Sequence, residues 1–425
     1  MRGFERRATV VTMRLTLPRT NVITLLPAFA LGAMLRMLYA AKTPYWIHAY
    51  DWQGHQQYVL FLTEYGHLPS ATFGWETFQP PLFYGLAALW MTTVSVLGWS
   101  YGSLQILSVI ISLLTLAVGL WIGTLIWKHR EDSAALMIYG LLVAACPALV
   151  YQASQITNDG LSLLLAVLLI GLLLRWHETQ RLSHWILLSV VAGLGLLTKS
   201  SALLLLPVVT IAVLCAPRLL TQQKTKLLLT LALVITIVAG WFFVLRFGIE
   251  GQTSLVGNSA QIHESLKVPR RIKDVLVFNP VSVVLQPFVD DLVAPRREYL
   301  FEHTFRSALF GHRYVEPLRL ASLLAFSALG ALLLACKGMT SKRMPERMAL
   351  GWTVLFMLAG AVTYRYFTPS IANAHIRFVL PILIPLSVFA VHGATMLAEK
   401  NKPAGYALLG SVVLLSTAVI LRLSF

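Results

Sequence analysis

YDWQGHQQYVLFLTEYGHLPSATFGWETFQPPLFY, residues 50–84, is the first long polar stretch after the first apolar run of the chain, at 22–41. It carries an acid, Asp51, and a histidine four residues later, His55. If residues 51–65 are helical, this spacing places both side chains on one helix face. Two interpretations stay open for the pair: a reactive carboxylate with a neighbour that orients it, binds substrate or shares a metal, or a solvated helix at the membrane surface.

The composition of the whole chain indicates its class. Of its 425 residues, 57% are hydrophobic and only 12% are charged, which is typical of a polytopic helical membrane protein. The formal charge of +16 would suit nucleic acid. Basic residues between spans, however, orient membrane proteins and attract anionic lipid head groups. We therefore predict an all-α integral membrane protein with membrane lipids, and no nucleic acid, among its partners.

The apolar runs and the basic clusters between them predict a topology. If every run crosses the membrane, the basic clusters at 175–181 and 218–226 lie outside. If residues 80–98 form a re-entrant or surface-lying helix instead, those clusters lie inside, as the positive-inside rule requires. This choice predicts about eleven transmembrane helices. The candidate runs are 22–40, 80–98, 101–127, 134–153, 161–175, 184–198, 201–216, 227–247, 317–336, 349–366, 376–398 and 404–421.

The same topology predicts how the chain is organised. Residues 1–425 form one integral membrane domain, with a first outer loop at 41–99 that holds juxtamembrane or re-entrant helices. A long outer loop at 248–316 carries Arg270 and Arg271. This loop is either a lid over an anionic lipid substrate or a solvated segment that touches lipid head groups.

Several polar residues fall at span ends on the predicted outer face. They are Asp51, Asn158, Asp159, Lys199, His375 and Arg377. Ionisable groups near a membrane are costly and often functional, so their convergence indicates a site. For Asn158 and Asp159 the alternative is a turn with a helix cap. For Lys199, Arg377 and Arg36 the alternatives are phosphate binding or a structural role, such as snorkelling to the interface or capping a span.

Other residues and motifs narrow the possibilities. Tyr58 and the aromatic residues after it are expected to be interfacial anchors rather than a sugar-stacking platform. The sequence contains no Walker-type phosphate loop, Rossmann glycine fingerprint, CxxC pair or HExxH motif. It therefore offers no support for nucleotide-driven transport or zinc-protease chemistry.

Taken in order, the polar motifs resemble those of a known superfamily. They are Asp51 in the first outer loop, the segment from Tyr58 to Pro69, QPPLFY at 79–84, TNDG at 157–160, GLLTK at 195–199, TFRSALFG at 304–311 and RFVLP at 377–381. They resemble the GT-C membrane glycosyltransferases, in particular the branch of the protein O-mannosyltransferases and lipid A aminoarabinose transferases. Family members often carry a second acid beside the first, whereas here Trp52 follows Asp51.

The resemblance implies a GT-C-like fold and an inverting hexosyl- or pentosyltransferase. Its donor would be a sugar linked to polyprenyl phosphate, and its acceptor a glycan, lipid or protein hydroxyl outside the membrane. Asp51 would be the general base, with Asp159 as a second catalytic acid. Any divalent metal would use Asp51, His55 or Asp159. The substrate-binding candidates are His55, Asn158, Lys199, Arg377, His375, Arg36, Arg270 and Arg271. The expected location is the bacterial inner membrane, with the site facing the periplasm or exterior.

Two other classes remain as alternatives. A transporter or flippase of lipid-linked glycans would be expected to show inverted repeats and broken helices near the midplane, which the sequence does not clearly show. A polymerase or ligase of such glycans would be expected to depend on loop arginine and histidine rather than on an acid in the first loop.

Overall fold

The computed structural model describes residues 19–47, 51–128, 133–217, 219–255, 264–288, 299–311, 315–341, 344, 346–400 and 403–424. Within these ranges every regular element is a helix, and the one extended pairing is an isolated bridge between Lys267 and Ser370. The predicted all-α fold class is therefore confirmed.

Among the described residues, 8 helices are long and apolar enough to cross a membrane. Five are single α-helices, and three are extended by other helical turns. They are α1 (Arg19–Lys42), η1 with α4 (Tyr101–Ser103, Leu104–Ile126), α7 (Asn158–Thr179), α10 to η5 (Thr221–Ile235, π-helix η4 Thr236–Gly240, α11 Trp241–Phe243, π-helix η5 Val244–Ile249), α15 (Leu318–Met339), α16 (Arg347–Phe367), η11 with α17 (Leu380–Ile382, Leu383–Ala398) and α18 (Ala404–Ser424).

The shorter apolar helices correspond to the remaining predicted runs. They are α3 (Leu82–Ser95), α5 (Ser133–Ala145), α8 (Leu182–Leu196) and η3 with α9 (Ser200–Leu205, Leu206–Leu214). The run at 134–153 is broken after α5, because the residue before a proline avoids helical geometry. Cys146 is extended there, and a short helix, α6 (Pro147–Tyr151), restarts at the proline. Every predicted run thus contains a helix, while the number of crossings stays a prediction.

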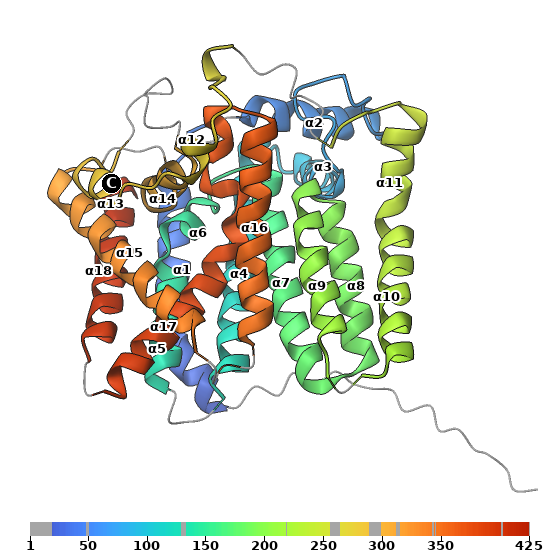
Figure 1. Cartoon of the computed structure of the whole chain (residues 1–425). Helices are drawn as coiled ribbons and strands as arrows, with labels where there is room; N and C mark the ends of the chain where they lie inside the picture. The colour runs from blue at the N-terminus through green and yellow to red at the C-terminus, as the bar shows by residue number, and fades with distance from the viewer. Residues whose placement is uncertain are drawn as a thin grey trace, which may run out of the picture.

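The long helices stand side by side as a bundle, and further helices gather at one end of it, the top of Figure 1. There α2 (Trp52–Tyr65) lies across the bundle and packs against α3. The same end holds α12 (Ile272–Leu276), α13 (Pro280–Leu285) and α14 (Leu300–Phe310). We call this end the outer face, after the predicted topology. The first outer loop and the described parts of the second therefore share one face.

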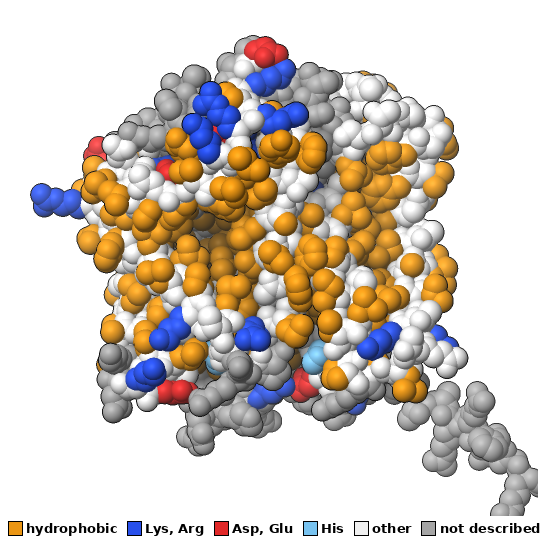
Figure 2. All heavy atoms as spheres, in the orientation of Figure 1, with side chains coloured by type: hydrophobic (Ala, Val, Ile, Leu, Met, Phe, Trp, Pro, Cys, Tyr) orange, Lys and Arg blue, Asp and Glu red, His pale blue; other side chains and the backbone are white. Residues whose placement is uncertain are grey.

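The surface of the bundle suits a bilayer. In the view of Figure 2, hydrophobic side chains cover the middle of the molecule, and Lys and Arg side chains gather above and below this band. Such a band satisfies the requirement that lipid contacts apolar groups while charged groups reach water or head groups. The arrangement agrees with an integral membrane protein.

The helices differ greatly in how deeply they are buried. In α7, which packs against α4 and α8, 67% of the apolar window lies inside the protein. The helix from α10 to η5 packs against α8 at the edge of the bundle, and only 17% of its window is buried. The outer ends of both helices nevertheless carry buried charged residues.

Candidate active site

Asp51 stands immediately before α2, and two distant segments hold its carboxylate. Its Oδ2 accepts a hydrogen bond from Arg377 Nη1 at 2.8 Å, and its Oδ1 accepts one from Trp75 Nε1 at 3.2 Å. Arg377 belongs to a short turn, η10 (Ile376–Phe378), that precedes α17. Burial alone would raise the pKa of Asp51, but the Arg377 guanidinium and weaker partners outweigh burial and lower this pKa. Asp51 is therefore ionised at neutral pH.

A second ion pair joins Asp159, in the first turn of α7, to Lys199, just after α8. Only 4% of the Asp159 side chain and 13% of the Lys199 side chain are exposed. The N-cap of α7 is Thr157, whose hydroxyl accepts a hydrogen bond from the Asp159 amide. The capping role considered for Asn158 and Asp159 therefore belongs to Thr157.

The two ion pairs are neighbours. Lys199 Nζ lies 5.4 Å and the Arg377 guanidinium carbon 5.0 Å from the centre of the Phe378 ring. Both cations therefore contact one aromatic ring. The predicted convergence of these four charged residues on one face is present in the structure, although their chemical roles stay predictions.

Amide side chains connect the first outer loop to the second pair. Asn158 Nδ2 donates to Gln79 Oε1 at 3.3 Å and to the Thr198 carbonyl at 3.1 Å. Gln79 Nε2 in turn donates to Glu76 Oε2 at 3.0 Å. Asn158 thus holds the loop before α3 against the end of α8, which is a positional role.

Glu76 is a buried acid that the sequence analysis missed. Its side chain packs against α2, since a Cβ added at Gly54 would lie 2.9 Å from Glu76 Cγ. Burial, reinforced by the nearby Asp51 charge, raises the pKa of Glu76 to about 8. The site therefore contains a second carboxyl group from the same loop, which is mostly protonated at neutral pH. The only signal in the sequence was an acid shortly before the QPP motif.

The two histidines of the prediction have different surroundings. The predicted helix is present as α2, but it begins after Asp51; His55 lies in its first turn, with Nδ1 2.8 Å from the Tyr84 hydroxyl. Burial lowers the pKa of His55 to about 4 despite the opposing effect of Asp51, so the ring is neutral. His375 Nδ1 accepts the Arg377 amide at 3.1 Å and so caps the turn that carries this arginine.

Tyr58 does not have the environment expected of an interfacial anchor. It is fully buried, its ring stacks on Tyr84 with centroids 3.9 Å apart, and its hydroxyl donates to the Gln79 carbonyl. The expectation for Tyr58 was wrong because α3 folds back onto α2 and covers this face.

Three predicted substrate-binding arginines lie apart from the ion pairs. Arg36 is fully buried, and it donates to Ser112 Oγ and to the Gly32 and Ala144 carbonyls, all at 3.0 Å. These contacts correct the expectation, because they secure the break after α5 and leave the guanidinium inside the core. Arg270 and Arg271 are exposed, and within the described residues neither pairs with Asp51 or Asp159.

The metal candidates do not form a metal centre in this geometry. Across the described part of the chain, no group of three or more His, Cys, Asp or Glu side chains could hold a metal ion. Asp51 is engaged by Arg377 and Trp75, His55 contacts Tyr84, and Asp159 pairs with Lys199. The described side chains therefore do not fit a metal.

A cavity adjoins the ion pairs. It occupies about 510 Å³, its open mouth included, and its polar lining includes Asp159, Lys199 and Arg377. Its other walls are mainly apolar side chains of α7, α8, η3, α16 and η11, including Leu163, Leu169, Val191, Leu205, Met357 and Leu380. The cavity thus combines a charged end on the outer face with an apolar interior between helices.

Solved structures with a similar arrangement define the class of fold. The oligosaccharyltransferase of Archaeoglobus fulgidus without ligand aligns over 95% of this chain and 55% of its own, with 13% identity and a TM-score of 0.54. Its complex with an inhibitory peptide and a dolichol-phosphate aligns over 94% and 55%, with 12% identity and a TM-score of 0.55. The chain spans about half the length of that enzyme. The predicted GT-C fold is confirmed.

A weaker likeness and a family match complete the comparison. ArnT from Cupriavidus metallidurans, bound to undecaprenyl phosphate, aligns over 89% of this chain and 78% of its own, with 14% identity and a TM-score of 0.43. No curated protein matches the chain. Residues 67–292 match the family described as predicted membrane protein (DUF2142), and the chain belongs to that family.

Proposed function

We propose that this protein is an inverting glycosyltransferase. It moves a sugar from a polyprenyl-phosphate-linked donor to an acceptor hydroxyl on the outer side of the membrane, in a bacterium the periplasmic side of the inner membrane. The observation that carries the proposal is the pair of neighbouring ion pairs, Asp51–Arg377 and Asp159–Lys199, beside a mainly apolar cavity whose polar lining includes Asp159, Lys199 and Arg377.

The cavity suits the donor. A polyprenyl chain is rejected by water and gains free energy in an apolar groove between helices. The two cations at its charged end suit a phosphate. Arg377 Nε is buried and has no hydrogen-bond partner among the described residues, so it has a donor to offer. The GT-C fold and the dolichol-phosphate bound by the archaeal oligosaccharyltransferase support this choice of donor.

In the proposed reaction, three of the four charges have a part. Asp51 accepts the proton of the acceptor hydroxyl while that oxygen attacks C1 of the sugar. The bond between C1 and the phosphate oxygen breaks on the opposite side, and the phosphate leaves with the bonding electrons. Lys199 and Arg377 stabilise the negative charge on this leaving group. A single displacement inverts C1 and needs no carboxylate nucleophile.

The test is a transfer assay with purified protein and a panel of polyprenyl-phosphate sugars, scored by release of prenyl phosphate. Asp51→Asn is expected to lower turnover by about two to four orders of magnitude, as loss of a general base does. Glu64→Gln, which changes an exposed acid on the same helix, is the matched control and should retain turnover. Full turnover in Asp51→Asn would exclude Asp51 as the base.

A binding measurement separates the remaining cases. Asp51→Asn should still bind the donor, because the cavity and both cations are intact. If the wild type neither turns over nor binds any donor of the panel, the glycosyltransferase assignment fails, and the transport alternative becomes the better account.

A further inference from the structure

Arg246 is an unusual residue in an otherwise lipid-facing helix. The helix from α10 to η5 has a mean hydropathy of 2.6 in its most apolar window, yet Arg246 near its outer end is 0% exposed. Its helix neighbours Val244 and Ile249 are 63% and 75% exposed. A guanidinium withdrawn from water is costly unless it is paired and hydrogen-bonded, so its contacts call for an explanation.

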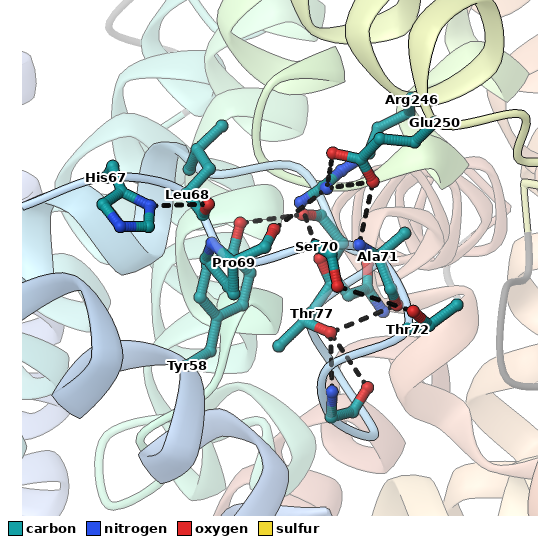
Figure 3. A network of polar contacts seen from close by, with 12 residues as sticks. Tyr58, His67, Leu68, Pro69, Ser70, Ala71, Thr72, Thr77, Arg246 and Glu250 are labelled. Carbon is teal, nitrogen blue, oxygen red and sulfur yellow. Dashed lines mark hydrogen bonds and ion pairs between the residues drawn. The ribbon is translucent and has the colours of Figure 1, made fainter. Parts of the chain in front are cut away.

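Figure 3 shows the contacts that Arg246 and Glu250 make with the loop at residues 69–77. Arg246 Nη1 donates to the Pro69 carbonyl at 3.0 Å, and Nη2 donates to the Thr77 carbonyl at 2.8 Å. Nη1 also lies 2.7 Å from both carboxylate oxygens of Glu250. Glu250 Oε2 accepts the Ala71 amide at 2.9 Å. One ion pair on the outlying helix thus fastens both ends of residues 69–77 through main-chain atoms.

The π-helical geometry explains how Arg246 reaches the loop. It lies in η5, and a second π-helical segment, η4, precedes it in the same helix. A π turn contains about one residue more than an α turn, which rotates later side chains by about 100° around the axis. Such segments recur at functional sites. Arg246 lies in such a segment and is buried against the protein, whereas Val244 and Ile249 of the same segment are exposed.

The fastened loop leads directly to the proposed base. Between the attachment points, within residues 69–77, Trp75 donates to Asp51 and Glu76 packs against Gly54 of α2. Contacts inside the loop shape it as well: Thr77 Oγ1 contacts Gly74 and Ala71, and Ser70 Oγ lies 3.5 Å from Thr72 Oγ1. The position of the Trp75 indole therefore depends on where the loop is anchored.

We propose that Arg246 and Glu250 are positioning residues for the transfer reaction, anchoring residues 69–77 so that Trp75 holds the Asp51 carboxylate. The proposal rests on the proposed role of Asp51 as base. It assigns the outer end of the lipid-facing helix to the active site, although neither residue contacts the cavity. The groups that face Asp51 are Arg377, His55, Trp75 and Glu76, of which the anchor controls the last two.

The first measurement needs no activity. Hydrogen–deuterium exchange of residues 66–79 is compared between the full-length wild type, Arg246→Gln and Glu250→Gln. Arg246→Gln should accelerate exchange of the Ala71 amide and its neighbours by about tenfold or more, since hydrogen bonds to a charged group are lost. Arg175→Gln, which breaks an exposed pair on the opposite face, is the control and should leave this peptide unchanged. Unchanged exchange in Arg246→Gln and Glu250→Gln overturns the anchor.

The second measurement is the pH profile of kcat. Loss of the Trp75 hydrogen bond should raise the pKa of Asp51. The acid limb of the profile, where Asp51 becomes protonated, should therefore move to higher pH in Arg246→Gln. The KM for donor should change less than about twofold. Trp75→Phe should reproduce this shift, and the double variant should add none. Arg246→Lys should restore part of the wild-type profile.

The outcomes separate the two proposals. Faster exchange with an unmoved acid limb shows that the loop is anchored but does not position the base, which overturns the inference. Absence of both transfer and donor binding in the wild type removes the glycosyltransferase proposal instead, and the exchange result then still decides the anchor. If Arg246→Gln does not fold, Glu250→Gln gives the same comparison with a smaller change, because glutamine keeps an acceptor for the Ala71 amide.

Discussion

Arg377 and Arg246 are both outer-face arginines tied to the first outer loop, but they use different kinds of partner. Arg377 pairs with the Asp51 side chain, and 18% of its own side chain is exposed beside a cavity. Arg246 is fully buried and binds two main-chain carbonyls and an acid of its own helix. A side-chain partner can exchange for a substrate phosphate, whereas a main-chain partner fixes the path of the backbone.

This difference distinguishes reacting from positioning residues within a single network. The region around Arg377 has side-chain pairs that can open and an adjoining cavity. The contacts of Arg246 instead fix the main chain of residues 69–77. Replacing the first arginine should therefore alter chemistry most, and replacing the second should alter loop order most.

The largest effect is expected at Arg377. Arg377→Ala removes a cation from the proposed leaving group and the partner of Asp51, so transfer should fall by about two to three orders of magnitude. Arg377→Lys keeps the charge without the bidentate fork and should recover only part of the rate. The measurement is kcat and donor KM for each variant. Activity within about twofold of wild type in Arg377→Ala would show that the comparison is mistaken.

The buried pair of Asp159 and Lys199 should dominate stability. Lys199→Met leaves a buried carboxylate unpaired, and we expect it to lower the free energy of unfolding by about 3 kcal/mol. The double variant Asp159→Asn/Lys199→Met removes both charges and should lose less. Lys128→Met, at an exposed pair with side chains 42% and 40% exposed, is the control and should cost less than about 1 kcal/mol. Thermal unfolding in detergent measures all three.

Equal stability of Lys199→Met and the control would contradict this expectation. It would mean that Asp159 finds another partner or is protonated when the lysine is lost. In that case Lys199 would resemble the exposed cations rather than Arg377.

The fold was predictable because lipid imposes a simple rule. Apolar runs must be helical, and each predicted run contains a helix. The convergence of Asp51, Asp159, Lys199 and Arg377 followed from the side of the membrane on which each span ends. Their pairing did not follow, since Asp51 and Arg377 are 326 residues apart in the chain and nothing local specifies their contact.

The missed residues share one physical reason. Arg246 holds the loop through main-chain carbonyls, which every residue possesses, so the sequence marks only its helix partner Glu250 and not the segment that it fastens. The unusual pKa of Glu76 arises from burial against Gly54, which only the folded chain provides. Tyr58 was misplaced for a similar reason, because the return of α3 over α2 buries it.

The smallest expected effect is a pH dependence at Glu76, which lies between the two regions. Its pKa is about 8 in the folded protein and 4.5 ordinarily, so between these values the folded state binds the proton more tightly than the unfolded state. The resulting stability is fully present below pH 4.5 and is lost as the pH rises to about 8. Glu76→Gln cannot titrate, so its unfolding free energy should lack this loss and gain about 1 kcal/mol or more on the wild type by pH 8.

Thermal unfolding of both proteins from pH 5 to 9 measures this gain. The gap should widen up to about pH 8 and then stay constant, because both states of the wild type are then ionised at Glu76. Parallel curves would show that Glu76 is ionised in the folded protein at neutral pH. Combining Glu76→Gln with Arg246→Gln then tests the link to the anchor. A released loop exposes Glu76 to water. The difference in unfolding free energy between Arg246→Gln and the double variant should therefore no longer depend on pH in this window.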